Sequence, residues 1–228
     1  MKNTQINRKA TIKVAKALGD LNDQVVFVGG VVVSLYIDDP AADDVRPTKD
    51  VDLSFKILTG GDLEKLREKL NQRGFKQSHT DDVICRFSLD DVKVDIMSTH
   101  QVGWAPANRW FEKGFELAVI KKLDDISIKI MPLSYFLAAK FDAFKGRGSK
   151  DARTSHDFED IVYILNYTSD FTKSILVSDT EVKEYLRECF NNILNSEHLQ
   201  EAIIGHLYYE ESEERYQIIL NQLKEIMV

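Results

Sequence analysis

The segment VGGVVVSLYIDDPAADDVRPTKDVDLSF, residues 28–55, decides the fold of the chain. It begins at the end of a β-branched run, QVVFV, which predicts a buried strand closed by a tight turn at Gly29-Gly30. The apolar residues 31–37 are too few for periodicity to separate a strand from a short helix. A polar loop follows, and the alternating residues 48–55 predict a second strand.

Two aspartates of this second strand, Asp50 and Asp52, are separated by a single residue. Side chains alternate across a strand, so both carboxylates are expected on one face. Neighbouring carboxylates repel each other, and a cation between them relieves the repulsion. Hard oxygen ligands on a rigid strand are typical of magnesium sites. The D-x-D pattern is common at strand ends, however, so a metal site needs further residues.

Asp95 is the candidate third acid. It lies in KVDIM, a strand-like run in which apolar residues flank the acid. An acid that points inward from such a strand lowers stability unless it is paired or bound to metal. The alternative is that Asp95 faces solvent on an edge strand, because Lys93 and Asp95 share a face.

The residues around this segment predict helices and strands mixed around one sheet. The amphipathic stretches 4–18 and 62–74 predict helices. Residues 84–98 and 115–131 predict β-hairpins, since each has an Asp-Asp pair near its centre. These turn pairs are Asp90-Asp91 and Asp124-Asp125.

Beyond residue 131 the pattern becomes purely helical. Pro132 suits the first turn of a helix, and Ser155 can cap the helix that follows it. The expected helices cover residues 132–144, 156–167, 179–194, 196–207 and 211–227. The predicted fold class is therefore α+β: a mixed β-sheet with flanking helices in a domain of residues 1–131, followed by an all-helical domain of residues 132–228.

Composition limits the classes of function. The chain has 228 residues and a net charge of −7. Its hydrophobic content of 43% is typical of a folded soluble protein. The negative charge falls in the helical half, which argues against general binding to long nucleic acid. The chain lacks an apolar run long enough for a membrane span or a signal peptide, so we expect a cytoplasmic protein with no membrane partner. Its two cysteines are far apart, and we expect both to be free thiols. A basic cluster in the helical half could still contact a nucleic-acid end: Lys140, Lys145, Arg147, Lys150 and Arg153.

The order strand, Gly-Gly, helix, loop, D-x-D strand and later single-Asp strand resembles the DNA polymerase β-like nucleotidyltransferase superfamily over residues 24–98. The AbiEii-like toxin-type branch fits best. Its R-x-T-x-D-x-D pattern is matched by Arg46, Thr48, Asp50 and Asp52. Its later K-x-x-A…R…D-x-x-D pattern is matched in KFDAFKGRGSKDARTSHDFEDIVYIL by Lys140, Ala143, Arg147, Asp157 and Asp160. The resemblance also favours a helix for residues 31–37.

The resemblance implies a role for each matched residue. Asp50, Asp52 and Asp95 would bind two Mg²⁺ ions, with Asp95 nearer the acceptor and helping to take its proton. Gly29 and Gly30 would hold the triphosphate through backbone N–H groups. The family usually places Ser or Thr directly after the glycine pair, where this chain has Val31, and Ser34 follows one helical turn later. The expected nucleotide-binding set is completed by Arg46, Thr48, Lys140, Arg147, Asp157 and Asp160, with Lys140 also expected to be catalytic.

The expected function is magnesium-dependent transfer of a nucleotide from a nucleoside triphosphate such as ATP to an acceptor hydroxyl, on tRNA or protein. The toxin-type branch further implies a possible cognate antitoxin. Two alternatives stay open. An aminoglycoside could be the acceptor, because the acidic helical half suits a polycation. The chain could also be a non-catalytic antitoxin or binding partner that keeps the fold, an interpretation that Val31 favours and the three acids oppose.

Overall fold

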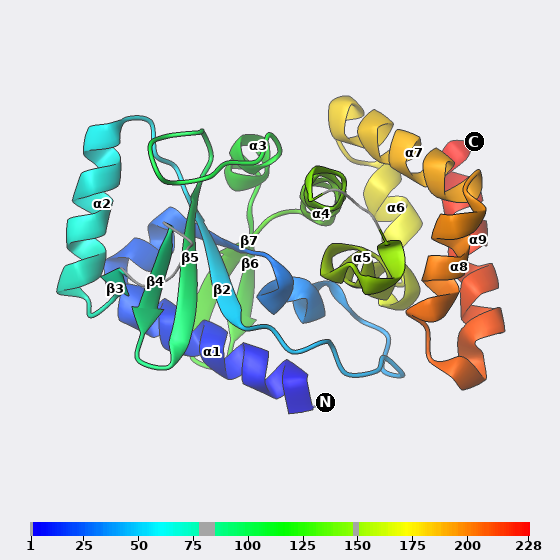
Figure 1. The fold of residues 1–228 in the computed structure, drawn as a ribbon, viewed down its shortest axis with the longest axis horizontal. Coiled ribbons are helices and arrows are strands. Elements are labelled where there is room, and N and C mark those ends of the chain that lie inside the picture. The colour runs from blue at the N-terminus through cyan, green and yellow to red at the C-terminus, as the bar shows by residue number, and fades with distance from the viewer. Residues whose placement is uncertain (1, 78–84, 148–150) are drawn as a thin grey trace. The chain divides into compact units, whose positions relative to one another are not determined.

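A computed structural model describes residues 2–77, 85–147 and 151–228. The chain forms two compact units (Figure 1). The sheet unit comprises Met1–Leu35 and Asp43–Pro132, and the helical unit comprises Tyr36–Ala42 and Leu133–Val228. Within the described ranges, no helix has both the length and the apolar character that crossing a membrane requires.

The sheet unit is built on a mixed sheet that has seven strands in the described part of the chain, in the order β3-β4-β5-β2-β1-β7-β6. At its centre β1 runs antiparallel to β2, and β2 runs parallel to β5. All four residues of β1 are buried, as the β-branched run predicts. The strands are β1 Val25–Val28, β2 Asp50–Phe55, β3 Lys76–Gln77, β4 Arg86–Leu89, β5 Val92–Ser98, β6 Val119–Leu123 and β7 Ile126–Ile130.

Both predicted hairpins are confirmed, β4 with β5 and β6 with β7. Their turns contain Asp90 and Asp124, each with φ near +50° (52° and 53°). Aspartate tolerates this left-handed conformation better than most residues do. The second hairpin is shorter than predicted, because residues 111–116 form a helix and β6 begins only at Val119.

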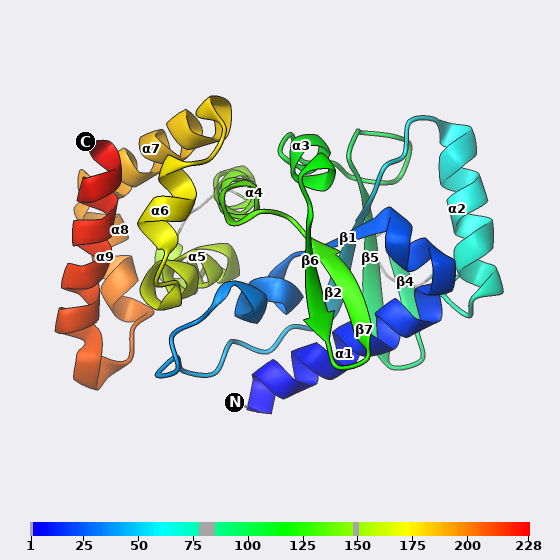
Figure 2. The same cartoon turned by 180° about the vertical axis from the view of Figure 1, so that it is seen from behind.

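Helices lie beside and across this sheet. Figures 1 and 2 show α1 crossing the sheet, where it contacts β2 and β7, and α2 beside the β3 edge. Residues 30–36 form a 3₁₀ helix, so the helical alternative for this stretch is confirmed. The helices of this unit are α1 Lys2–Leu18, the 3₁₀ helices Gly19–Gln24 and Gly30–Tyr36, α2 Gly60–Gln72 and α3 Phe111–Glu116.

The helical unit packs around buried aromatic side chains. Phe190 contacts Phe141 and Phe171 edge-on, with ring centroids 5.8 and 5.9 Å apart. The Ser155 hydroxyl accepts from the N–H of Phe158, which confirms the predicted cap. The five expected helices are present, and α6 was not expected. Their bounds are α4 Leu133–Gly146, 3₁₀ Ala152–Thr154, α5 His156–Tyr167, α6 Phe171–Leu176, α7 Thr180–Leu194, α8 Glu197–Gly205, 3₁₀ Tyr209–Glu211 and α9 Ser212–Met227.

The segment Tyr36–Ala42 belongs to the helical unit although it interrupts the sheet unit in sequence. The backbone N–H groups of Asp38 and Asp39 donate to the carbonyl of Tyr167, both at 3.3 Å. The Asp39 carboxylate also accepts from Arg215 of α9 at 2.9 Å. These contacts explain why this polar loop is ordered against the helices.

Candidate active site

The three predicted acids lie on adjacent strands of the sheet. Asp50 and Asp52 are on β2, and Asp95 lies directly opposite Asp52 on β5. Residues paired across neighbouring strands face the same side, so all three carboxylates share one face of the sheet. Asp95 is only 7% exposed, so it does not face solvent as the alternative interpretation required.

Arg86 of β4 joins two of these acids. Its Nε and Nη2 donate to the two carboxylate oxygens of Asp95, both at 2.7 Å, and Nη2 also reaches Oδ2 of Asp50 at 3.1 Å. The forked geometry of a guanidinium matches a carboxylate, which makes this type of pair strong. The sequence analysis did not identify Arg86 as a site residue.

Gly29 has to be glycine for two reasons. Its φ of +72° is strained for residues with a side chain. A Cβ atom at this position would also overlap the carboxylate of Asp52. The turn backbone therefore lies directly against one of the proposed metal ligands, which links the Gly-Gly pair to the D-x-D strand in space.

Gly30 also allows a close approach, in this case of the Arg46 and Thr48 side chains. A Cβ atom there would overlap the guanidinium of Arg46 and the methyl group of Thr48. Asn7 of α1, which is 1% exposed, binds the segment that contains Arg46 and Thr48. Its Oδ1 accepts from the Thr48 hydroxyl at 3.1 Å, and its amide donates to the carbonyl of Arg46 at 3.4 Å.

Val31 and Ser34 lie in the 3₁₀ helix Gly30–Tyr36. Residues three apart align along a 3₁₀ helix, so Ser34 follows Val31 on the same side, one turn further from the glycine pair. Val31 is 3% exposed and packs in the core. The position that the family usually fills with a hydroxyl therefore contributes to packing here.

The negative charges of the acids affect the pKa of a nearby thiol, that of Cys85. The pKa of Cys85 is raised from 9.0 to about 11, mainly because the thiol is buried, with a further contribution from the negative charges of Asp95 and Asp52. Both effects oppose formation of the thiolate anion. Cys85 is therefore held as a neutral thiol.

The arrangement of the acids bears on whether they can hold magnesium. Across residues 2–77, 85–147 and 151–228, no three His, Cys, Asp or Glu side chains are placed to hold one metal ion as they stand. The chemistry nevertheless fits, since three hard carboxylates on rigid strands lie beside a glycine turn. The Arg86 guanidinium already contacts Asp50 and Asp95, so a metal ion would have to take over contacts that it makes.

A second cluster of predicted residues lies in the helical unit. Lys140 of α4 donates to Asp160 at 2.7 Å and to Asp157 at 3.2 Å. The two acids stand three residues apart on α5, so they share a helix face. Arg147 completes the group by donating to Asp157 at 2.8 Å. Lys140 is 7% exposed and is therefore not a lysine of the solvated surface.

The remaining basic residues of this half have different partners. Lys145 lies 3.2 Å from the Cys189 sulfur and 4.5 Å from the Tyr185 ring centroid. Arg153 pairs with Asp151 in its own loop at 3.1 Å. Lys150 lies outside the described residues. The basic run in the sequence is thus divided among separate local contacts.

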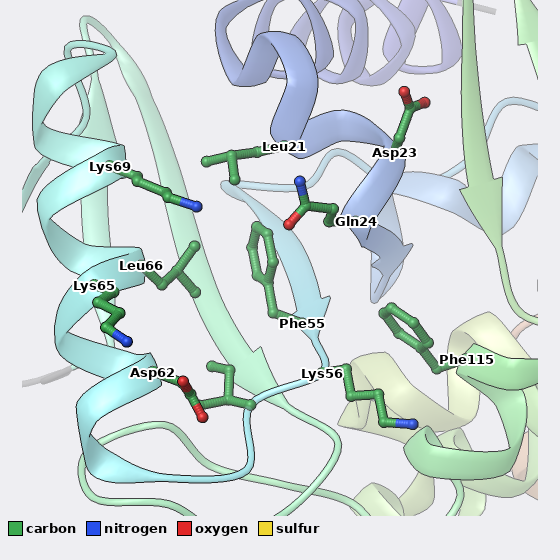
Figure 3. Close-up of a pocket in the computed structure, with 11 residues that line it drawn as sticks. Leu21, Asp23, Gln24, Phe55, Lys56, Asp62, Lys65, Leu66, Lys69 and Phe115 are labelled. Atoms are coloured by element: carbon green, nitrogen blue, oxygen red, sulfur yellow. The ribbon is translucent and has the colours of Figure 1, made fainter.

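A pocket of about 490 Å³ lies in the sheet unit where β2 ends, and its rim carries Lys56, Lys65 and Lys69 (Figure 3). Asp50 begins the same strand at its other end. None of the residues that line the pocket is a predicted site residue. The site is therefore defined by the aspartates and the glycine turn, and this pocket is separate from it.

A family model described as the nucleotidyl transferase AbiEii toxin of type IV toxin–antitoxin systems matches residues 14–225. The chain belongs to this family. It is therefore a nucleotidyltransferase, as the motifs predicted, and AbiEii membership suggests a cognate antitoxin as a partner. A search of the curated proteins found no match.

One solved structure agrees with the AbiEii assignment at the level of the fold. The antibiotic-resistance factor ANT(2'')-Ia is similar with a TM-score of 0.50 and 14% identity, over 85% of this chain and 97% of that one. An antigenic nucleotidyltransferase-like protein from Paracoccidioides brasiliensis has a TM-score of 0.49 and 15% identity, over 85% and 91% of the two chains. The predicted nucleotidyltransferase fold, a mixed sheet with flanking helices followed by helices, is confirmed.

Arg86 could have been found from the sequence with one further step. The predicted Asp90-Asp91 turn sets the register of the hairpin, with Leu89 opposite Val92. Counting back along both strands puts Arg86 opposite Asp95. Asn7 offered no such signal, because its contact with Thr48 spans 41 residues of sequence.

Proposed function

We propose that this nucleotidyltransferase moves a nucleotide from a nucleoside triphosphate to an acceptor hydroxyl, with magnesium held by Asp50, Asp52 and Asp95. One observation carries the proposal: the three carboxylates share a face of β2 and β5, and Asp52 lies against the Gly29 backbone. A triphosphate held at this turn would have its charged oxygens close to the three acids of the motif.

The turn residues would bind the phosphates. A positive φ at Gly29 followed by Gly30 allows successive backbone N–H groups to point to one side, an arrangement that attracts anions. Arg46, whose guanidinium lies against Gly30, would add positive charge at the same place. In this proposal Ser34 contributes its hydroxyl from the next turn of the 3₁₀ helix, and Thr48 holds the Arg46 segment in position.

The acids would carry the chemistry. Bound magnesium would neutralise charge on the triphosphate during an in-line displacement. Asp50 and Asp52 would hold that metal, and Asp95 would accept the proton of the attacking hydroxyl. The pyrophosphate leaves towards the N–H groups of Gly29 and Gly30.

In the helical unit, Arg147 is the best candidate for a phosphate contact. Its side chain is 72% exposed, so it can turn to a phosphate at little cost, whereas Lys140 is buried between Asp157 and Asp160. Lys140 would then act by keeping α4 and α5, and hence Arg147, in place. Arg147 thus keeps its place in the predicted nucleotide-binding set, and Lys140 is proposed to position it.

The acceptor is proposed to be a large molecule, either tRNA or protein, in keeping with a toxin of this family. An aminoglycoside is the second candidate, because the helical half carries the net charge of −7 and one structure of similar fold is an antibiotic-resistance factor. A polycation would be attracted to such a surface.

Labelled triphosphates test the proposal directly. The protein is incubated with each labelled nucleotide and magnesium, together with separate pools of tRNA, protein and aminoglycosides. Incorporation of label into the tRNA or protein pool, lost on chelation of the metal and in Asp52→Asn, is the expected result. Label in the aminoglycoside pool would select the second candidate, and transfer that persists in EDTA would contradict the metal role.

A further inference from the structure

Arg86 occupies the place in the aspartate cluster where a cation is expected. Its hydrogen bonds at 2.7, 2.7 and 3.1 Å go to Asp95 and Asp50, two of the acids that the proposed function assigns to metal binding. The side chains of Arg86 and Asp95 are 15% and 10% exposed, so the pair is largely removed from water. Water therefore screens the charges of the Arg86–Asp95 pair poorly.

An arginine differs from a lysine or a histidine in this position. Its guanidinium keeps its charge at all accessible pH values, so it cannot leave the acids by losing a proton. A metal ion that binds Asp95 would meet both oxygens already accepting from Arg86. Either the guanidinium moves, or the ion binds against a positive charge a few ångströms away.

We propose that Arg86 is a built-in competitor of the metal. It neutralises Asp50 and Asp95 when no metal is bound, stabilises the free protein, and gives up these contacts when metal and triphosphate arrive together. This inference rests on the proposed metal role of the aspartates. It makes metal binding depend on nucleotide, since the triphosphate supplies negative charge that the displaced guanidinium can contact.

The competing explanation is that Arg86 only joins β4, β5 and β2. A residue with that role would orient Asp95 for the metal, and its removal would weaken metal binding or leave it unchanged. A competitor predicts the opposite sign. The sign of the change in metal affinity, measured without nucleotide and without reference to activity, separates the two explanations.

The experiment titrates Mn²⁺ alone into the nucleotide-free protein and follows the electron paramagnetic resonance signal of the free ion. Arg86→Gln is expected to bind Mn²⁺ about tenfold more tightly than the wild type, a change of about 1.4 kcal/mol. Adding Asp95→Asn to that variant should remove the gain. Arg67→Gln is the matched control, because it deletes one positive charge from an exposed pair with Glu64 on α2.

Arg86→Lys and thermal melting protect the test against misfolding. The lysine keeps the charge but loses the forked contact, so its Mn²⁺ affinity should fall between those of the wild type and Arg86→Gln. Without metal, both variants should have a lower melting temperature than the wild type. Adding Mn²⁺ should raise their melting temperatures by more than it raises that of the wild type. Unchanged or weaker Mn²⁺ binding in both variants would overturn the inference while leaving the metal site intact. Absence of Mn²⁺ binding in every protein, with and without triphosphate, would overturn the proposed metal role as well.

Discussion

The two acid clusters of this protein differ in how their carboxylates are paired with cations. In the sheet unit, three aspartates share one face, and Arg86 contacts two of them. In the helical unit, two aspartates are matched by two cations, Lys140 and Arg147. In the first cluster one guanidinium is shared by two carboxylates, whereas in the second the Lys140 ammonium contacts both carboxylates and Arg147 contacts one of them as well.

This difference indicates what each cluster is for. The carboxylates of Asp157 and Asp160 and the ammonium of Lys140 are buried, and breaking a buried ion pair costs stability. In the sheet cluster, a guanidinium shared by two carboxylates beside a third can be replaced by another cation, because the acids repel one another once it moves away. We therefore expect the sheet cluster to bind a cation and Lys140 to support the fold of the helical unit.

The largest expected effect follows from Asp52→Asn. Transfer should fall at least a thousandfold, about 4 kcal/mol of transition-state stabilisation. The melting temperature without magnesium should stay the same or rise, because one of three mutually repelling charges is removed. Activity assays and thermal melts of the same preparation check both parts. An active variant, or one that no longer folds, would contradict the metal role.

Lys140→Ala should have its main effect on stability. It leaves Asp160 buried without its lysine, and removing one partner of a buried pair costs about 3–5 kcal/mol. Urea denaturation measures this, with Arg147→Ala as the control, since its exposed side chain should change stability by less than about 1 kcal/mol.

Nucleotide titrations at two salt concentrations separate the roles of these two residues. Arg147→Ala should weaken triphosphate binding, and the loss should be greatest at low salt, where a phosphate contact counts most. If a folded Lys140→Ala protein loses triphosphate binding while Arg147→Ala does not, the lysine contacts the phosphates. The structural role expected for Lys140 would then be wrong.

Gly29→Ala tests how closely the turn and the aspartate fit. The left-handed backbone alone should cost about 1–2 kcal/mol in alanine, and the overlap with Asp52 should add to that cost and reduce transfer. Gly74→Ala is a matched control, because Gly74 has a φ of +89° but no atom within 4 Å of the added Cβ. Equal losses in the two variants would show that the contact with Asp52 does not matter.

The smallest effect concerns Cys85, whose pKa is raised from 9.0 to about 11, first by burial and then by Asp95 and Asp52. The folded protein resists ionising this thiol and the unfolded chain does not, so stability present below pH 9.0 should decline as the pH rises towards 11. Cys85→Ser should lose less stability over this range, as urea denaturation at a series of pH values can measure. A wild type and variant with the same pH dependence would remove the thiol as a reporter of the acids.

Much of the arrangement follows from local patterns. The hairpin turns at Asp90 and Asp124, the cap at Ser155 and five helices of the second half were predicted, because each depends on residues close in sequence. The family was predicted from the resemblance of these motifs to those of known nucleotidyltransferases, and the family model confirms it. The short helices α3 and α6 were missed, as six residues are too few for periodicity to identify.

The tertiary structure decided what depends on contacts between distant segments. Whether Asp95 is buried or exposed could not be read from KVDIM, because the answer lies in its pairing with β2 and in Arg86. The requirement for glycine at position 29 comes from Asp52, and the support of Thr48 comes from Asn7. The local sequence shows which residue types are available to the site. The packing of strands brings Asp50, Asp52, Asp95 and Arg86 together, because proximity in space depends on contacts between segments that lie far apart along the chain.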